Sequence, residues 1–189
     1  MSGEPGAGTD LGRILLVGFM GSGKSSVGRA LGRALGWRFV DFDKAIAAEE
    51  GRSVPEIFRT SGEAHFRRAE ARVGQGLLGE DRVVLASGGG WAAAPGRLDA
   101  VPPGTATFWL RVSCEEAVRR VGAGARLRPL LAAPDAEERA ARLLEEREPF
   151  YRLADWAVDT DRRSVEDVTA EVLGILRREY PAVTRTEAE

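Results

Sequence analysis

The fold is decided by one stretch, Gly18-Phe19-Met20-Gly21-Ser22-Gly23-Lys24-Ser25, which fits the pattern G-x-x-x-x-G-K-[ST]. The aliphatic run Arg13 to Val17 precedes it and is typical of a buried strand. Apolar residues then recur at helical spacing from Ser26 to Gly36. Strand, glycine loop and helix together form a cradle in which backbone N–H groups and a helix N-terminus face a phosphate. The residues expected to contact a nucleotide here are Gly21, Ser22, Gly23, Lys24, Ser25 and Ser26.

Two acidic residues follow the next predicted strand. Arg38-Phe39-Val40 leads into Asp41 and Asp43, and alternation along an extended chain would place both carboxylates on one face. The carboxyl ends of parallel strands form the ligand-binding edge of a sheet. Asp41 and Ser25 are therefore expected to hold Mg²⁺, Asp41 through water, while Asp43 orients or deprotonates an acceptor hydroxyl. The alternative is that Asp43 only caps a helix that begins near Lys44.

Composition limits the class of protein. The chain has 189 residues, 43% of them apolar, which predicts one compact domain over 12–180 with flexible tails at 1–11 and 181–189. Its 27 basic and 29 acidic residues nearly cancel, so no strong basic field favours a nucleic acid or a membrane surface as partner. The lone Cys114 cannot form an internal disulfide, and no run approaches the roughly 18 apolar residues of a membrane span. We expect a cytoplasmic monomer.

A second region carries a resemblance to a known family. The run Gly51 to Glu70 predicts two helices separated by a break at Gly62. Its letters G-R-S-x-x-E-I-F and G-E-x-x-F-R-R-x-E, taken with the P-loop and the Asp pair, resemble the shikimate kinases. The resemblance continues through Gly88-Gly89-Gly90, Arg128-Pro129-Leu130-Leu131 and Arg147-Glu148-Pro149-Phe150-Tyr151. It implies phosphoryl transfer from MgATP to the 3-hydroxyl of shikimate, a ring that carries three hydroxyls and one carboxylate.

Two arginines suit that carboxylate. Arg67 borders an apolar helical stripe, and the resemblance implies that it binds the shikimate carboxylate. Arg147 continues the inward helical spacing of Leu143 and Leu144, where a guanidinium must find an anion. The planar fork of arginine can meet a carboxylate in two parallel hydrogen bonds. The alternative for each is an ordinary ion pair, which Glu70 could supply for Arg67.

Three consecutive glycines follow a third predicted strand. Gly88, Gly89 and Gly90 carry no side chains, so a ligand could approach their backbone closely, and the resemblance implies a substrate contact at Gly89. The alternative is a simple turn. Trp91 departs from the small residue expected at its position, and it either crowds the pocket or packs outside it. Ser26 is a second departure, because the family usually has threonine there.

A glycine-flanked, arginine-bearing run over about 122–134 predicts a mobile lid. Closure would bring Arg128 over the transferring phosphates and exclude water, and Arg126 is a second candidate for that contact. The resemblance implies that Arg163 stacks on adenine, with a solvated turn as the alternative. His65 and Cys114 are expected to be structural, because neither has a second His or Cys to build a catalytic pair.

The fold prediction is an α/β domain of three layers, a P-loop kinase fold with helices on both faces of a parallel sheet and a mobile lid. A substrate-binding section is expected over about 42–70. Two other functions remain open: a kinase for another small acceptor, and a module that binds ATP without transferring phosphate. The five strands are predicted near Arg13–Gly18, Arg38–Asp41, Arg82–Ser87, Thr105–Val112 and Trp156–Thr160.

Overall fold

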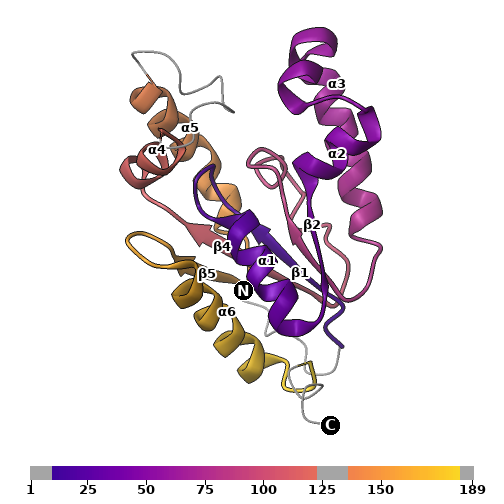
Figure 1. Cartoon of the computed structure of the whole chain (residues 1–189), viewed down its shortest axis with the longest axis vertical. Coiled ribbons are helices and arrows are strands. Elements are labelled where there is room, and N and C mark those ends of the chain that lie inside the picture. Colours follow the sequence, from indigo (N-terminus) through magenta and orange to yellow (C-terminus); the bar gives the residue numbers. More distant parts are fainter. Residues whose placement is uncertain (1–9, 123–135, 184–189) are drawn as a thin grey trace.

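A computed structural model describes residues 10–122 and 136–183. Its described residues form one sheet of parallel strands in the order β2-β3-β1-β4-β5 (Figure 1). The strands are β1 (Arg13–Val17), β2 (Arg38–Asp41), β3 (Val83–Ala86), β4 (Thr105–Arg111) and β5 (Trp156–Asp159). All five predicted strands are confirmed, with ends that agree to within about one residue, the usual uncertainty of strand boundaries.

Helices connect the strands and give the α/β class that the sequence predicts. The third helix is bent at Gly62, whose φ of 77° and ψ of 172° are not helical, so the predicted break there is confirmed. The helices are α1 (Lys24–Leu35), α2 (Phe42–Glu50), α3 (Val54–Leu77), α4 (Cys114–Gly122), α5 (Ala136–Tyr151) and α6 (Val165–Glu179).

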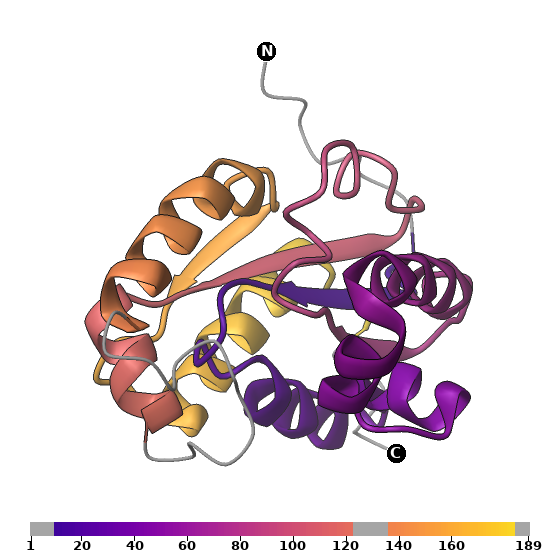
Figure 2. The ribbon, with the colours of Figure 1, turned by 90° about the horizontal axis from the view of Figure 1, so that it is seen from above.

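The central strand β1 shows how the layers form. Ile14 and Leu16 pack into a cluster with residues of α1 and α6, whereas Leu15 and Val17 pack into a second cluster with residues of α2, α3, α4 and α5. Alternation along the strand thus buries both of its faces, as parallel sheets require. The prediction of helices on both faces is confirmed. Figure 2 shows α1 and α6 below the sheet and α5 above it.

The topology makes β1 the central strand of the sheet. The chain leaves β1 toward β2 and β3 on one side and reaches β4 and β5 on the other, so β1 lies at the switch point of the sheet. Ligands bind at such points, beyond the carboxyl ends of the strands. The loop after β1 lies there, between α2 with α3 on one side and α4 with α5 on the other (Figures 1 and 2).

Several expectations fall outside the described part of the chain. Arg126, Arg128 and nearly all of the predicted lid lie within 123–135, and most of the two predicted tails lies within 1–9 and 184–189. The domain bounds and the lid therefore stay predictions. Among the described residues, no helix combines the length and apolar character needed to cross a membrane.

Candidate active site

The loop after β1 takes its shape from three glycines. Gly18, Gly21 and Gly23 have φ values of 135°, 75° and 90°, a region that residues with side chains rarely adopt. A Cβ on Gly18 would lie 2.6 Å from the Leu110 carbonyl oxygen, and one on Gly21 would lie 2.9 Å from the Ala117 carbonyl oxygen. The loop therefore packs tightly onto β4 and α4, which fixes the directions of its N–H groups.

Lys24 begins α1 and lies back over this loop. Its Nζ donates hydrogen bonds to the carbonyl oxygens of Gly18 and Phe19, both at 2.7 Å, and to Ser22 Oγ at 3.3 Å. The N-cap residue Gly23 supplies no side-chain acceptor to the helix N-terminus. The ammonium group and the positive end of the helix dipole are thus concentrated at one place, as a phosphate site needs.

Ser25 and Asp41 lie together beside the loop. Ser25 Oγ donates to Asp41 Oδ2 at 2.5 Å, while Asp41 Oδ1 accepts from the backbone N–H of Asp43 at 3.1 Å and of Lys44 at 3.4 Å. Asp41 is thus the N-cap of α2. The alternative that Asp43 is the cap is wrong, because the helix begins at Phe42. The alternation argument is also wrong, since Asp43 lies in the first helical turn and not on an extended strand.

Asp41 and Asp43 nevertheless reach the same cavity. This cavity has a volume of about 310 Å³ and joins the P-loop to the ends of β2 and β3. The prediction that the phosphate loop and the acidic pair meet at one end of the sheet is therefore confirmed. Asp43 reaches this place from the first turn of α2 and not from an extended strand. The lining residues are Met20, Gly21, Gly23, Lys24, Ser25, Ser26, Asp41, Asp43, Ser87, Gly89 and Arg120.

The glycines after β3 allow charged groups to come close to the backbone. A Cβ on Gly88 would lie 2.5 Å from Glu70 Oε1 and 3.0 Å from Asp43 Oδ1. A Cβ on Gly90 would lie 2.4 Å from Arg67 Nη1. Side chains at the first and third of these glycines would displace these charged groups.

Gly89, the middle glycine, joins the two halves of the site. Its Cβ position lies 3.4 Å from Arg147 Nη1, 3.8 Å from the Gly18 carbonyl oxygen and 3.8 Å from the Met20 nitrogen. Arg147 comes from α5 and the other two residues from the P-loop. The inward direction predicted for the half-buried Arg147 side chain is confirmed, and its guanidinium lies next to the backbone expected to contact substrate.

Arg67 and Glu70 form an ion pair on α3. Arg67 Nη1 donates to Glu70 Oε2 at 2.8 Å, and Arg67 Nη2 donates to Glu63 at 3.2 Å. Burial alone would lower the pKa of Arg67, but its hydrogen bond to Glu70 raises it above the usual value. Burial raises the pKa of Glu70 in spite of the opposing effect of Arg67. The ion pair expected as an alternative for Arg67 therefore exists, and the same Arg67 guanidinium lies against Gly90.

Trp91 packs outside the cavity. Its side chain is 3% exposed, and its ring meets the Phe42 ring edge to face at 5.5 Å between centroids. Its Nε1 lies 2.5 Å from the position of a Cβ on Gly74, so only glycine leaves room for the indole on α3. The indole is therefore part of the buried core and does not line the cavity.

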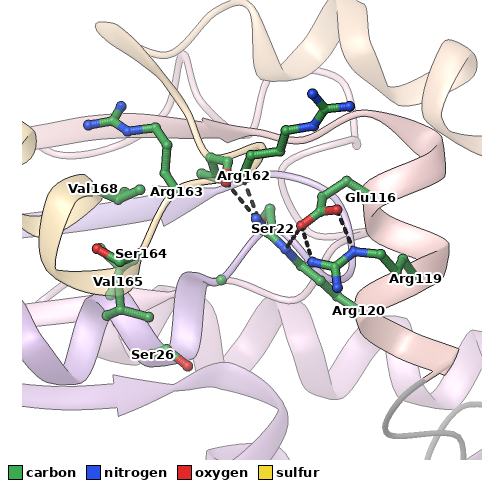
Figure 3. A pocket seen from close by; sticks show the side chains of 13 residues that line it. Ser22, Ser26, Glu116, Arg119, Arg120, Arg162, Arg163, Ser164, Val165 and Val168 are labelled. Atoms are coloured by element: carbon green, nitrogen blue, oxygen red, sulfur yellow. Dashed lines mark hydrogen bonds and ion pairs between the residues drawn. The ribbon is translucent and has the colours of Figure 1, made fainter.

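A second pocket, of about 450 Å³, adjoins the P-loop on the side of α4 and α6 (Figure 3). Arg120 crosses it, with Nε donating to Glu116 at 2.7 Å, Nη1 to the Gly21 carbonyl oxygen at 3.1 Å and Nη2 to the Thr160 carbonyl oxygen at 2.5 Å. Hydrogen bonds from Arg119 and Arg120 lower the pKa of Glu116 to about 2. The lining residues are Ser22, Gly23, Ser26, Val27, Glu116, Arg119, Arg120, Thr160, Arg162, Arg163, Ser164, Val165 and Val168.

Arg163 lines the same pocket, but its guanidinium is bonded to residues at the end of β5 and on α6. Its guanidinium donates to the carbonyl oxygens of Asp159 and Asp167 at 3.0 and 3.1 Å and to Glu171 at 2.5 Å. In Figure 3 its side chain points away from the pair of Arg120 and Glu116. Stacking of Arg163 on adenine stays a prediction, and Arg120 is the arginine directed across the pocket.

Sequence reasoning missed four residues that the fold brings to the site. Glu70 was considered only as an ion-pair partner, although its spacing of three from Arg67 was visible. Nothing in the sequence indicated that Arg120 and Tyr151 would reach these loops, because their contacts there cross 40 residues or more of chain. Glu116 is bonded to Arg120 within the same helix and lines the same pocket. His65 bonds to Glu50 at 3.0 Å, as a structural residue would.

The doubly wound sheet, the P-loop with its lysine, and an adjoining carboxylate and arginine site define a P-loop kinase for a small anionic acceptor. The family model for shikimate kinase matches residues 20–177. A shikimate kinase of Mycobacterium avium is 46% identical over 80% of this chain and 86% of its own length, and one of Mycobacterium tuberculosis is 42% identical over 92% and 98%. The chain belongs to the shikimate kinase family.

The same likeness is found among solved structures. A shikimate kinase from Acinetobacter baumannii, solved in complex with shikimate, matches with a TM-score of 0.84 and 32% identity over 90% of this chain and 95% of its own. Family membership supports a shikimate kinase over both open alternatives, and it implies that ATP is the phosphoryl donor.

Proposed function

We propose that this chain transfers the γ-phosphoryl group of MgATP to the 3-hydroxyl of shikimate, giving shikimate 3-phosphate and ADP. The observation that carries the proposal is the position of Gly89, which lies against the P-loop on one side and against Arg147 on the other. A phosphate donor and a carboxylated acceptor bound to these two regions would meet at the cavity that contains Asp43. Catalysis then consists mainly of positioning and charge neutralisation.

For the nucleotide, we assign the P-loop N–H groups and Lys24 to the phosphates. Lys24 would exchange contacts with loop carbonyl oxygens for contacts with the outer phosphates. The 450 Å³ pocket beside the loop has room for the nucleoside, between Arg120 and the apolar side chain of Val165. Arg163 at its rim keeps its predicted role in stacking on adenine, and Arg128 keeps its predicted role over the transferring phosphates.

The donor atoms beside the loop fit Mg²⁺. Ser25 Oγ and the Asp41 carboxylate are oxygen ligands only 2.5 Å apart, so both can serve one hydrated ion. Among the described residues, no group of three or more His, Cys, Asp or Glu could hold a metal by itself. This is the arrangement expected when water and substrate phosphates complete the coordination. When bound, Mg²⁺ supplies neutralisation of phosphate charge.

For the acceptor, Arg67, Arg147 and the backbone of Gly88, Gly89 and Gly90 would hold the carboxylate. Asp43 would accept the proton of the 3-hydroxyl while the oxygen of that hydroxyl forms a bond to the γ-phosphorus. The bond from that phosphorus to the bridging oxygen breaks, and ADP leaves with the electron pair. Arg67 is held in place by its ion pair with Glu70, and Arg147 would supply a second guanidinium for the substrate carboxylate.

The test is ADP release by the purified chain with MgATP, with and without shikimate. Gluconate and nucleoside monophosphates serve as alternative acceptors, and phosphorus NMR of the product identifies the esterified hydroxyl. We expect release that depends on shikimate and a phosphate ester at the 3-position. Release with another acceptor alone, or ATP binding without any release, would contradict the proposal. The monomeric state is tested by light scattering at working concentration.

A further inference from the structure

Tyr151 connects α5 to the triple glycine by a hydrogen bond. It is the last residue of α5, its side chain has no exposed surface, and its hydroxyl donates to the Gly89 carbonyl oxygen at 2.5 Å. The two residues are 62 positions apart in sequence. No role for Tyr151 follows from the phosphate loop, the acidic pair or the two arginines.

The peptide group that Tyr151 contacts has unusual freedom. Gly89 and Gly90 lack side chains, so their backbone could rotate more readily than that of other residues. Because a trans peptide is planar, fixing the Gly89 carbonyl also fixes the Gly90 N–H on the opposite edge. A hydrogen bond to this carbonyl therefore sets the orientation of backbone proposed to face the substrate.

The same hydroxyl lies close to Arg147, one helical turn earlier on α5. A hydroxyl has one proton to donate and two lone pairs to accept, so it can serve Gly89 and Arg147 together. Burial raises the pKa of Tyr151 to about 12, while Arg147, through its charge and a hydrogen bond, acts in the opposite direction. Tyr151 is therefore protonated at neutral pH and available as a donor.

The ring of Tyr151 is held by the core. It packs against the Trp109 ring on β4 at 6.2 Å between centroids, so the place of the hydroxyl is set by the sheet. Trp109 also belongs to the cluster that contains Phe42, from the first turn of α2. The packing of the ring in the core therefore holds the hydroxyl in place beside Gly89 and Arg147.

We propose that Tyr151 is a positioning residue for the acceptor carboxylate, because it orients both the Gly89 peptide and the Arg147 guanidinium. The inference rests on the proposed function, which assigns these two groups to shikimate. A residue of this kind should affect binding of the acceptor far more than the nucleotide or the chemical step.

The test is Tyr151→Phe in the full chain, which removes one oxygen and keeps the ring. We expect the KM for shikimate to rise about tenfold, while kcat and the KM for ATP change by less than about twofold. Tyr180→Phe is the matched control, because it makes the same chemical change away from the site. Tyr180 packs against Trp156 at the end of α6. The shikimate KM of this control should stay unchanged.

A second acceptor separates positioning from a loss of structure. The methyl ester of shikimate keeps the hydroxyls but has no carboxylate anion, so Tyr151→Phe should raise its KM by less than about twofold. An unchanged KM for shikimate, or equal rises for the acid and the ester, would overturn the inference. Failure of the proposed function would instead appear in the unsubstituted chain, as ADP release that does not depend on shikimate.

Discussion

The nucleotide side and the acceptor side of this site are built in different ways. The phosphate-binding part of the nucleotide side comes from the contiguous stretch Gly18 to Ser25, and its key groups are backbone N–H groups and one lysine. The acceptor side is assembled from α2, α3, the triple glycine and α5. A phosphate cradle can be made locally because any backbone supplies N–H groups, whereas a carboxylate fork needs long side chains that converge from separate helices.

The largest effect should come from the local side. Lys24→Met removes the ammonium group that lies over the P-loop, and we expect kcat/KM to fall about a thousandfold because charge developing on the phosphates loses its partner. Steady-state kinetics measure this loss. Lys44→Met is a matched control, since Lys44 is the other lysine of the chain and is exposed. Comparable losses in both variants would contradict the assignment of Lys24.

Asp43 lies where the two sides meet. Asp43→Asn keeps the size of the side chain but removes the proton acceptor, so kcat should fall about a hundredfold while shikimate still binds. Single-turnover kinetics with a parallel binding titration separate these effects. Full turnover by a variant that binds shikimate normally would show that Asp43 is not the base.

The acceptor side should respond in binding. Arg67→Lys keeps the charge but loses the planar fork, so the KM for shikimate should rise about tenfold with kcat and the ATP KM nearly constant. Arg68→Lys makes the same change at the adjacent exposed position and should have no effect. An acceptor KM that is equal in both variants would show that the Arg67 fork does not hold the carboxylate.

The smallest effect is on stability and concerns Glu70. Burial raises the pKa of Glu70, so the folded chain holds this proton more tightly than the unfolded chain does. The contribution of Glu70 to stability is therefore greatest at low pH and declines as pH rises from the unfolded value near 4.5 through the folded value. Glu70→Gln should gain stability relative to the original chain over that interval.

Urea unfolding of both chains at several pH values measures this difference. Shikimate kinetics of the same variant should show a higher KM, because Arg67 has lost a charged partner. If the stability of Glu70→Gln relative to the original chain stayed constant or fell as pH rose, ionisation of Glu70 would not destabilise the fold. Together the two readouts show whether the acceptor side retains a buried charge for binding at the expense of stability.

The sequence predicted the sheet closely because its core strands β1 and β3 are short aliphatic runs followed by a glycine or a serine. The P-loop was equally clear, since its spacing and its context of strand and helix lie within one segment. Asp41 and Asp43 were placed at the right edge for a partly wrong reason, because the start of α2 depends on Asp41 as its cap. Local signals indicated the strand over Arg38–Asp41 but not that α2 would begin immediately after it, at Phe42.

The acceptor side was less accessible to sequence reasoning. Arg67 and Arg147 were found from helical spacing and the family resemblance, which indicate direction but not partner. The contacts of Tyr151 with Gly89 and of Arg120 with Gly21 join residues that are 62 and 99 positions apart. Such pairs depend on the packing of α4 and α5 against the sheet, which has no counterpart in the spacing of neighbouring residues.

The central claim is that the two sides bind their ligands separately and meet at Gly89. Isothermal titration of shikimate alone and of MgATP alone into Lys24→Met and Arg67→Lys tests it most directly. We predict that Lys24→Met weakens MgATP binding and keeps the shikimate Kd, while Arg67→Lys does the reverse by about tenfold. Loss of both ligands in each variant, or no loss of shikimate in Arg67→Lys, would contradict this account.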